Sequence, residues 1–193
     1  MSIDVRLVAY EPNGPRLGQL PHPLAVDVGQ PFNDLPSLRL TYSTHAPGAE
    51  LLDQPCEVAL EVYNPESGEW TEHPDSRFLR LQRSGDITDP TGSYTYTLPG
   101  YGWQMRKIRL YPGDSPLVDG KRGFLSANAG IILRTFLNEW HARGGSPEFT
   151  ADFSTAHDSA GQAWDKILTI YYAPGLDLLT VLTNLAEQGV CDW

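Results

Sequence analysis

The spacing of the apolar residues changes near residue 112, and this change constrains the fold more than any other feature of the sequence. Before it, apolar residues recur at every second position, as they do on β-strands with one buried face. After it, they recur with the 3.6-residue period of amphipathic helices. Residues 112–123, where the pattern changes, contain three Gly and two Pro. We therefore predict an α+β protein whose two parts comprise residues 1–112 and 113–193.

The first part is predicted to be an antiparallel β-barrel or sandwich, because short strands alternate with turns and no long helix interrupts them. The predicted strands cover residues 2–9, 24–28, 38–42, 56–64, 77–83, 93–100 and 103–111. Residues 49–52 are expected to form one helical turn. Cys56 alternates with apolar residues and is predicted to lie in the core. Four acidic residues are expected to form a solvated face: Glu57, Glu61, Glu66 and Glu69.

The second part is predicted to be an α/β subdomain with two helices. The first helix is expected over residues 126–143, with Ser126 as its N-cap. Residues 166–173 are rich in β-branched and aromatic side chains, which favour a strand. The second helix is expected over residues 177–189, where a Gly ends it. The last residues look like the start of another strand, so we expect the fold to continue beyond Trp193 or to be completed by another chain.

The composition argues against several functional classes. A formal net charge of −10 repels phosphate groups, and no basic run is long enough for sequence-specific nucleic-acid binding. No stretch approaches 18 apolar residues, so no membrane span is predicted. The N-terminus lacks the features of a signal peptide. Cys56 and Cys191 form no metal-binding pattern, and they predict free thiols in a chain made in a reducing cytoplasm.

The sequence contains five histidines, none of them in a catalytic or metal-binding pattern. They are His22, His45, His73, His141 and His157. Four are expected in loops, and His141 is expected at a helix end, where it would interact with the helix dipole. A metal site at His157, Asp152 and Asp158 would need a further ligand from elsewhere in the chain. No nucleophile or phosphate-binding motif occurs. We therefore predict no catalytic, cofactor-binding or metal-binding residues, and no enzymatic activity.

Two further groups of residues have both a functional and a structural interpretation. Asp86 and Asp89 have the carboxylates for weak calcium binding, but their spacing suits turn residues better. Four aromatic residues are candidates for a sugar-binding face: Tyr94, Tyr96, Tyr101 and Trp103. Aromatic residues are also common on half-buried strands. The sequence leaves both interpretations of these four residues open.

Several segments together resemble the hub, or minor tail, proteins of long-tailed bacteriophages. The N-terminal half of those proteins is similar to the trimeric baseplate hub of contractile tails. The segments are the opening strand and its Gly-rich loop, PCEVALEVYN (55–64), RFLRLQRSGDITDPTGSYTYTLPGYGWQMRKI (77–108), SANAGIILRTFLNEWHARG (126–144) and SAGQAWDKILTIYYAPGLDLLTVLTNLAEQG (159–189), followed by CDW. In that family an RF strand, a helix rich in small residues and a second Leu-rich helix recur in this order. The resemblance covers most of the chain and rests on fold patterns.

The resemblance implies a β-barrel hub domain and an α/β subdomain that assemble as a homotrimeric ring at the virion tail tip, beneath the tail tube. The implied partners are the distal tail protein and the tape measure protein. An acidic ring would let DNA pass without binding it. Two alternatives stay open. One is a carbohydrate-binding β-sandwich that uses the four aromatic residues in host-surface recognition, and the other is a hydrolase whose nucleophile the sequence does not reveal.

Overall fold

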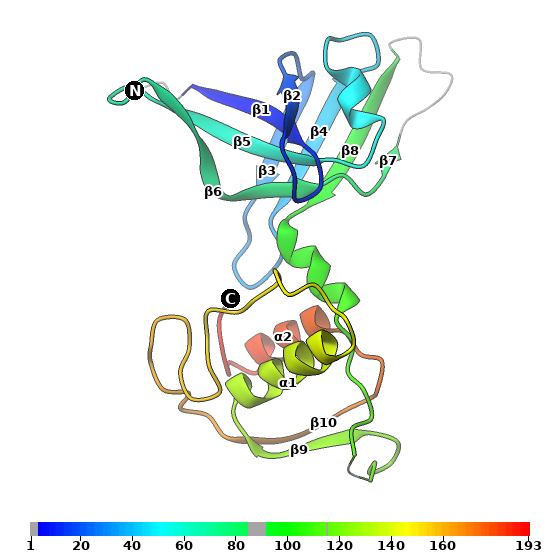
Figure 1. The fold of residues 1–193 in the computed structure, drawn as a ribbon, viewed down its shortest axis with the longest axis vertical. Coiled ribbons are helices and arrows are strands. Elements are labelled where there is room, and N and C mark those ends of the chain that lie inside the picture. Colours follow the sequence, from blue (N-terminus) through cyan, green and yellow to red (C-terminus); the bar gives the residue numbers. More distant parts are fainter. Residues whose placement is uncertain (1–3, 85–91, 115) are drawn as a thin grey trace. The chain divides into compact units, whose positions relative to one another are not determined.

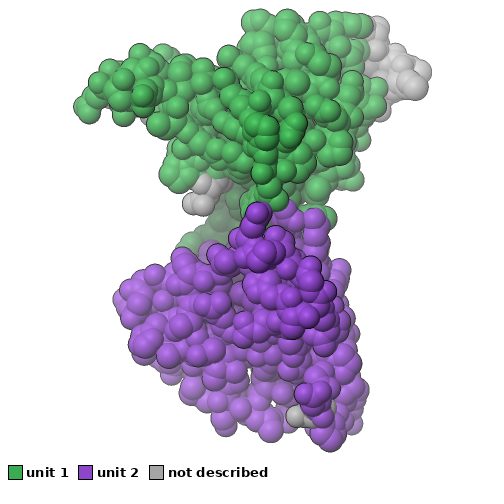
Figure 2. Space-filling view, viewed as in Figure 1, with its two compact units in different colours: residues 1–103 green, residues 104–193 purple. Residues whose placement is uncertain are grey.

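The chain divides into two compact units. The computed structural model describes three stretches: residues 4–84, 92–114 and 116–193. The units comprise residues 1–103 and 104–193, which Figure 2 colours separately. The division therefore falls before the predicted boundary at residue 112. It does so because Ile108 and Leu110 are buried in the core of the second unit.

The first unit contains two four-stranded antiparallel sheets (Figure 1). The first sheet, in the order β2-β1-β5-β6, consists of β1 (Val5–Tyr10), β2 (Arg16–Leu20), β5 (Glu57–Asn64) and β6 (Glu69–Leu79). The second sheet, in the order β3-β4-β8-β7, consists of β3 (Ala25–Gly29), β4 (Ser37–Ser43), β7 (Arg83–Ser84) and β8 (Ser93–Pro99). The predicted antiparallel architecture is confirmed. The described strands do not close into a barrel.

Side chains from both sheets build one apolar core in the first unit. Its fully buried members include Leu38, Leu40, Leu52, Val58 and Leu98. Cys56 lies in this core, as predicted, and the helical turn η1 (Ala49–Leu52) is present as a 3-10 helix. An isolated bridge between Phe78 and Gly100 connects β6 to the end of β8. The alternating pattern thus predicted the inner face of most strands correctly.

Two strand predictions in the first unit need correction. Residues 77–83 are predicted as one strand, but β6 ends at Leu79 and β7 belongs to the other sheet. The chain crosses between the sheets in the intervening residues. β2 is a strand that is not among the predicted ones. Gly18 interrupts its apolar pattern, and a Cβ atom there would lie 2.9 Å from the end of the Leu51 side chain, which would have to shift.

The predicted strand at residues 103–111 is also wrong. Residues Tyr101–Lys107 form the 3-10 helix η2. The chain then becomes extended, and the Leu110 N–H donates to the Leu176 carbonyl at 2.9 Å, while the Leu178 N–H donates to the Ile108 carbonyl at 2.9 Å. The apolar alternation in this run therefore reflects a short buried bridge within the second unit, because tertiary packing overrides strand propensity.

The second unit combines a two-stranded antiparallel sheet with two helices (Figure 1). Its elements are β9 (Arg122–Ala127), α1 (Ala129–Ala142), β10 (Leu168–Tyr172) and α2 (Leu178–Glu187). Both predicted helices and the strand within residues 166–173 are confirmed. The core includes Phe124 from β9, Phe136 from α1 and Leu185 from α2. Among the described residues, no helix has the length and apolarity needed to cross a membrane.

Side-chain caps define the helix starts in the second unit. The Oδ1 atom of Asn128 accepts a hydrogen bond from the Ile131 N–H at 2.8 Å, so Asn128 caps α1. Ser126, the predicted cap, lies in β9 with a positive φ of 51°. Asp177 caps α2 in the same way. Gly189, with φ of 62°, follows α2 in the left-handed conformation, as the sequence predicts.

Gly130, in the first turn of α1, packs directly against a loop. A Cβ atom at this position would overlap both the Trp164 indole and the Ser154 carbonyl, which are joined by a hydrogen bond of 3.0 Å from Nε1 of Trp164. Helix propensity alone would make Gly130→Ala stabilising by about 1 kcal/mol. We expect this substitution instead to lower the free energy of unfolding by about 1–3 kcal/mol, because the loop must move.

Urea denaturation of the full chain measures this effect. Asn138→Ala is the matched control, because Asn138 is exposed on the same helix and its replacement should raise stability by about 0.5 kcal/mol. A Gly130→Ala variant that gains as much stability as the control would contradict the proposed packing role.

Candidate functional site

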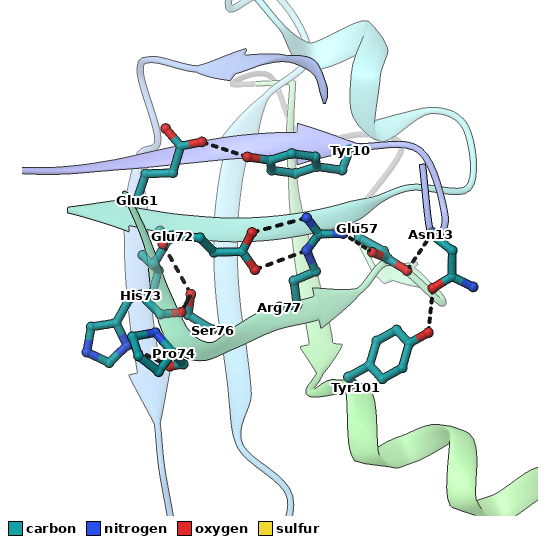
Figure 3. Close-up of polar contacts among 11 residues, drawn as sticks. Tyr10, Asn13, Glu57, Glu61, Glu72, His73, Pro74, Ser76, Arg77 and Tyr101 are labelled. Carbon is teal, nitrogen blue, oxygen red and sulfur yellow. Dashed lines mark hydrogen bonds and ion pairs between the residues drawn. The ribbon is translucent and has the colours of Figure 1, made fainter. Parts of the chain in front are cut away.

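The outer face of β1, β5 and β6 carries a buried network of charged and polar side chains (Figure 3). Glu57 is 1% exposed and Glu61 is 6% exposed, so the prediction of a solvated face is wrong for these two residues. Glu66 and Glu69 are exposed as predicted. Buried carboxylates require charged or hydrogen-bonding partners, and the neighbouring strands supply them.

Arg77, on β6, is the centre of one half of this network (Figure 3). Its guanidinium donates two hydrogen bonds to the Glu72 carboxylate, at 3.0 and 3.1 Å. A third hydrogen bond, from Nη1, reaches Oε2 of Glu57 at 2.9 Å. The guanidinium also lies 4.3 Å from the centroid of the Tyr10 ring. Arg77 therefore fastens β6 to β5 and covers Tyr10 on β1.

Glu61 is the centre of the other half. It accepts a hydrogen bond of 2.6 Å from the Tyr10 hydroxyl and one of 2.6 Å from Nε of Arg6. The Arg6 guanidinium lies 4.2 Å from the centroid of the Trp70 ring. Burial raises the pKa of Glu61, but the hydrogen bonds from Tyr10 and Arg6 and the nearby cationic charges outweigh burial and lower it overall. Glu61 is therefore an ionised acceptor at neutral pH.

A bulge in β6 brings these groups together. Between the pairs Ala59–Arg77 and Glu61–Glu72, β6 has four residues where β5 has one. Ser76, in this bulge, is fully buried, and its hydroxyl lies 3.1 Å from the Leu60 carbonyl. The bulge folds the strand back so that Glu72 and Arg77, five positions apart, form a bidentate pair.

The chemistry of this network suits stabilisation of the first sheet better than proton transfer. A general acid or base needs a pKa near the working pH, whereas Glu61 has a lowered pKa and both buried carboxylates are paired with Arg. The network extends through Asn13, whose N–H donates to Glu57 at 3.2 Å and whose amide oxygen accepts from the Tyr101 hydroxyl (Figure 3). It fixes the geometry of the first sheet.

An exposed apolar surface of the first unit lies along β3. This strand ends its sheet, and all five of its residues are exposed. Val26 and Val28 are 41% and 37% exposed, and the flanking Leu24 and Phe32 are 60% and 78% exposed. We call residues 24–32 the β3 edge. Proteins usually protect such edges with charges, Pro or bulges, so this surface is the candidate functional site.

A cavity of about 250 Å³ adjoins the β3 edge. Most of its lining side chains are apolar: Val5, Leu7, Leu20, Pro23, Val26 and Leu60. Its volume is below the roughly 300–1,000 Å³ typical of small-molecule pockets. The cavity therefore has the size and lining for one or two apolar side chains.

The four aromatic residues proposed for sugar binding do not share an open face. Tyr96 is 3% exposed and belongs to the core of the first unit. Tyr94 is half-buried beside it, and its ring lies 4.5 Å from the Arg83 guanidinium. Tyr101 and Trp103 lie on η2 rather than on a strand. The structural interpretation of Tyr96 is therefore confirmed.

The structure places several of the residues considered for metal binding or catalysis. His141, in the last turn of α1, lies 3.0 Å through Nε2 from the Phe149 carbonyl. His73 lies in the β6 bulge rather than in a loop. Cys56 and Cys191 are free thiols, and burial raises the pKa of each to about 11. Asp86 and Asp89 lie outside the described residues.

A larger hollow, of about 590 Å³, lies in the second unit. Its lining combines Trp164 and Trp193 with four acidic residues: Asp152, Asp158, Asp165 and Asp192. Asp158 accepts a hydrogen bond of 2.7 Å from the Gln162 N–H. Within the described stretches, no three His, Cys, Asp or Glu side chains converge on a point that could hold a metal ion. The acidic residues are spread around the hollow.

Comparison with known proteins adds no assignment. No protein-family model matches this chain, and no curated protein sequence matches it. The function must therefore be inferred from the surfaces described above and from the resemblance noted in the sequence.

Arg77 should contribute more to stability than an arginine in an exposed ion pair. Arg77→Met leaves the Glu57 carboxylate buried without its charged partner, which should lower the free energy of unfolding by about 3–5 kcal/mol. Arg83→Met removes an ion pair of 2.6 Å with Asp53, whose side chain is 65% exposed, and should cost about 0–1 kcal/mol. Denaturant unfolding of both variants makes the comparison. Equal losses would show that the Arg77 network does not brace the sheet.

Tyr10 should ionise far above its ordinary range. Burial, the hydrogen bond to Glu61 and the charge of Glu61 raise its pKa from 10.0 to about 12. The folded state thus holds the phenol proton more tightly than the unfolded state, so its contribution to stability is complete below pH 10 and is lost as the pH rises towards 12. Stability measured between these pH values should fall less steeply in Tyr10→Phe than in the unchanged protein. Identical slopes would contradict the assignment.

Proposed function

We propose that this protein is a structural component of a bacteriophage tail tip. In this proposal, chains made in the host cytoplasm assemble into a homotrimeric hub ring beneath the tail tube of the virion. The ring contacts the distal tail protein and the tape measure protein, and the chain acts by assembly without catalysis. The sequence resemblance supports the identity of the assembly, and the exposed β3 edge supports assembly as the mode of action.

The β3 edge is the observation that carries this proposal. A terminal strand with unpaired backbone groups and exposed apolar side chains is a template for pairing with another chain. Contiguous exposed apolar side chains also mark protein interaction surfaces. The β3 edge combines an unpaired strand with four exposed apolar side chains within nine residues of sequence: Leu24, Val26, Val28 and Phe32.

A second apolar surface lies on the two-stranded sheet of the second unit. Leu125 on β9 and Tyr171 on β10 are 67% and 39% exposed, and Ile167, just before β10, is 60% exposed. Leu125 and Tyr171 both lie beside Gly123, where a Cβ atom would be 3.7 Å from the Leu125 side chain and 2.9 Å from the Tyr171 ring. A cyclic ring joins two different surfaces of each protomer. This sheet face provides one surface for the contact between protomers, and the β3 edge stays open for a different tail protein.

The carbohydrate-binding alternative has less support from the geometry. A sugar platform needs aromatic faces open to solvent, and Tyr96 is buried in the core. The remaining aromatic candidates are only half-exposed. We therefore retain assembly at the tail tip as the proposed function.

The oligomeric state and tail-protein binding of the full chain test this proposal. We expect light scattering to give three times the chain mass of 21.4 kDa, and we expect the protein to bind purified distal tail protein. Leu125→Lys should reduce the trimer fraction because it places a charge in an apolar contact. Leu117→Lys is the matched control, since Leu117 is 40% exposed outside β9 and β10. A monomer at all concentrations that ignores tail proteins would overturn the proposed function.

A further inference from the structure

We propose that the β3 edge binds an extended segment of a different protein by strand addition. The segment carries alternating apolar residues on one side and a basic residue on the other, next to Asp27. This inference rests on the proposed assembly role and identifies the class of partner that one of its surfaces takes. Three observations support it: the register of β3, the adjoining cavity and the charge of Asp27.

The register shows that β3 exposes residues of the inner face. Val26 pairs with Leu40, and Val28 pairs with Leu38. Both Leu residues are 0% exposed in the core, and residues opposite each other in a sheet point to the same side. Val26 and Val28 are therefore core-facing residues at a place where the core is uncovered. An added strand would cover them with its own apolar side chains.

The cavity gives such a strand an anchor point. Val26 itself lines it, together with Leu7, Leu20 and Leu60 from the first sheet. An apolar side chain from a strand beside β3 would contact both sheets there. Burial of one such side chain contributes about 1.5–3 kcal/mol, which is enough to select an apolar residue at this position of the partner.

Asp27 determines the preferred charge of the partner. It lies on the opposite side of β3 from Val26 and Val28, is exposed, and pairs across the sheet with Arg39 on β4. A residue of an added strand opposite Asp27 would experience its charge directly, and opposite charges in cross-strand pairs are favoured. A segment with the pattern apolar–basic–apolar therefore fits the β3 edge.

The same charge argues against a second copy of β3 as the occupant. An antiparallel pairing of all five residues with the same strand of another copy would place Asp27 opposite itself. Like charges directly opposite each other are destabilising, and each chain already carries a net charge of −10. A different, basic segment avoids both penalties.

Two other terminal strands of the first unit, β6 and β7, are less suited to strand addition. β6 carries the bulge at residues 73–76, which includes Pro74, and it exposes Glu69 and Glu72. β7 has two residues, which is too short for a ladder. Bulges, Pro, charges and short length are the devices by which proteins protect edges. β3 carries the exposed charge of Asp27, but it has no Pro and no bulge in its pairing with β4, and its five residues make it longer than β7.

Two synthetic peptides test the proposal on the full chain. One is acetyl-Thr-Val-Thr-Val-Lys-Val-Thr-Val-Thr-amide, and the other has Glu in place of Lys. We expect the Lys peptide to shift the amide NMR signals of residues 24–29 and to bind about two- to fivefold more tightly than the Glu peptide. Asp27→Lys should reverse this preference. Val28→Lys should weaken both peptides about tenfold or more, while Leu81→Lys, at an exposed apolar residue away from β3, should not.

Three results would overturn the inference. They are peptide binding that leaves the amide signals of residues 24–29 unchanged, a charge preference that Asp27→Lys leaves unchanged, and β3 amides that are already protected by another copy of the chain. Thermal unfolding of each variant verifies that it is folded. Failure of peptide binding in a chain that still forms a trimer contradicts the strand addition alone. A strict monomer that binds the Lys peptide but no tail protein contradicts the proposed function alone.

Discussion

The first unit depends on the pairing of buried carboxylates with arginine. Glu57 and Glu61 point away from the apolar core yet are almost fully buried, and an unpaired carboxylate in such a place is strongly destabilising. Arg77 and Arg6 reach them from the two strands that flank β5. Because each arginine also lies over an aromatic ring, the three strands are held by charge, hydrogen bonds and packing at once.

The sequence predicted the parts of the fold that depend on local patterns. Alternation located β1, β4 and β5, and the helical period located α1 and α2. The errors arose where distant contacts decide the outcome. Glu57 has the spacing of a solvated residue, but the Arg77 guanidinium and the Asn13 N–H both donate to its carboxylate. Residues 103–111 have strand-like composition, but packing in the second unit divides them between a 3-10 helix and a short bridge.

The candidate site shows the same limit. The residues of β3 are a correct strand prediction, and nothing in their alternation indicates that Val26 and Val28 stay exposed. Their exposure follows from the order of strands, which places β3 at the end of its sheet, and Val26 also lines the cavity beside it. By contrast, Tyr94 and Tyr96 of β8 were candidates for a sugar-binding face, and Tyr96 is a core residue.

The pairing of the strands also constrains how the chain folds during synthesis. Ser37 on β4 pairs with Pro99 on β8, and Val5 on β1 pairs with Val62 on β5. Even the nearest residues of these two pairings, Tyr10 with Glu57 and Ser43 with Ser93, are 47 and 50 positions apart. That length of chain must leave the ribosome before β1 can meet β5 or β4 can meet β8, and such non-local pairings form slowly. The apolar faces of β1 and β4 remain open in the meantime. A nascent chain of this kind is exposed to aggregation at the stage when chaperones act, and its yield depends on how fast β5 and β8 follow.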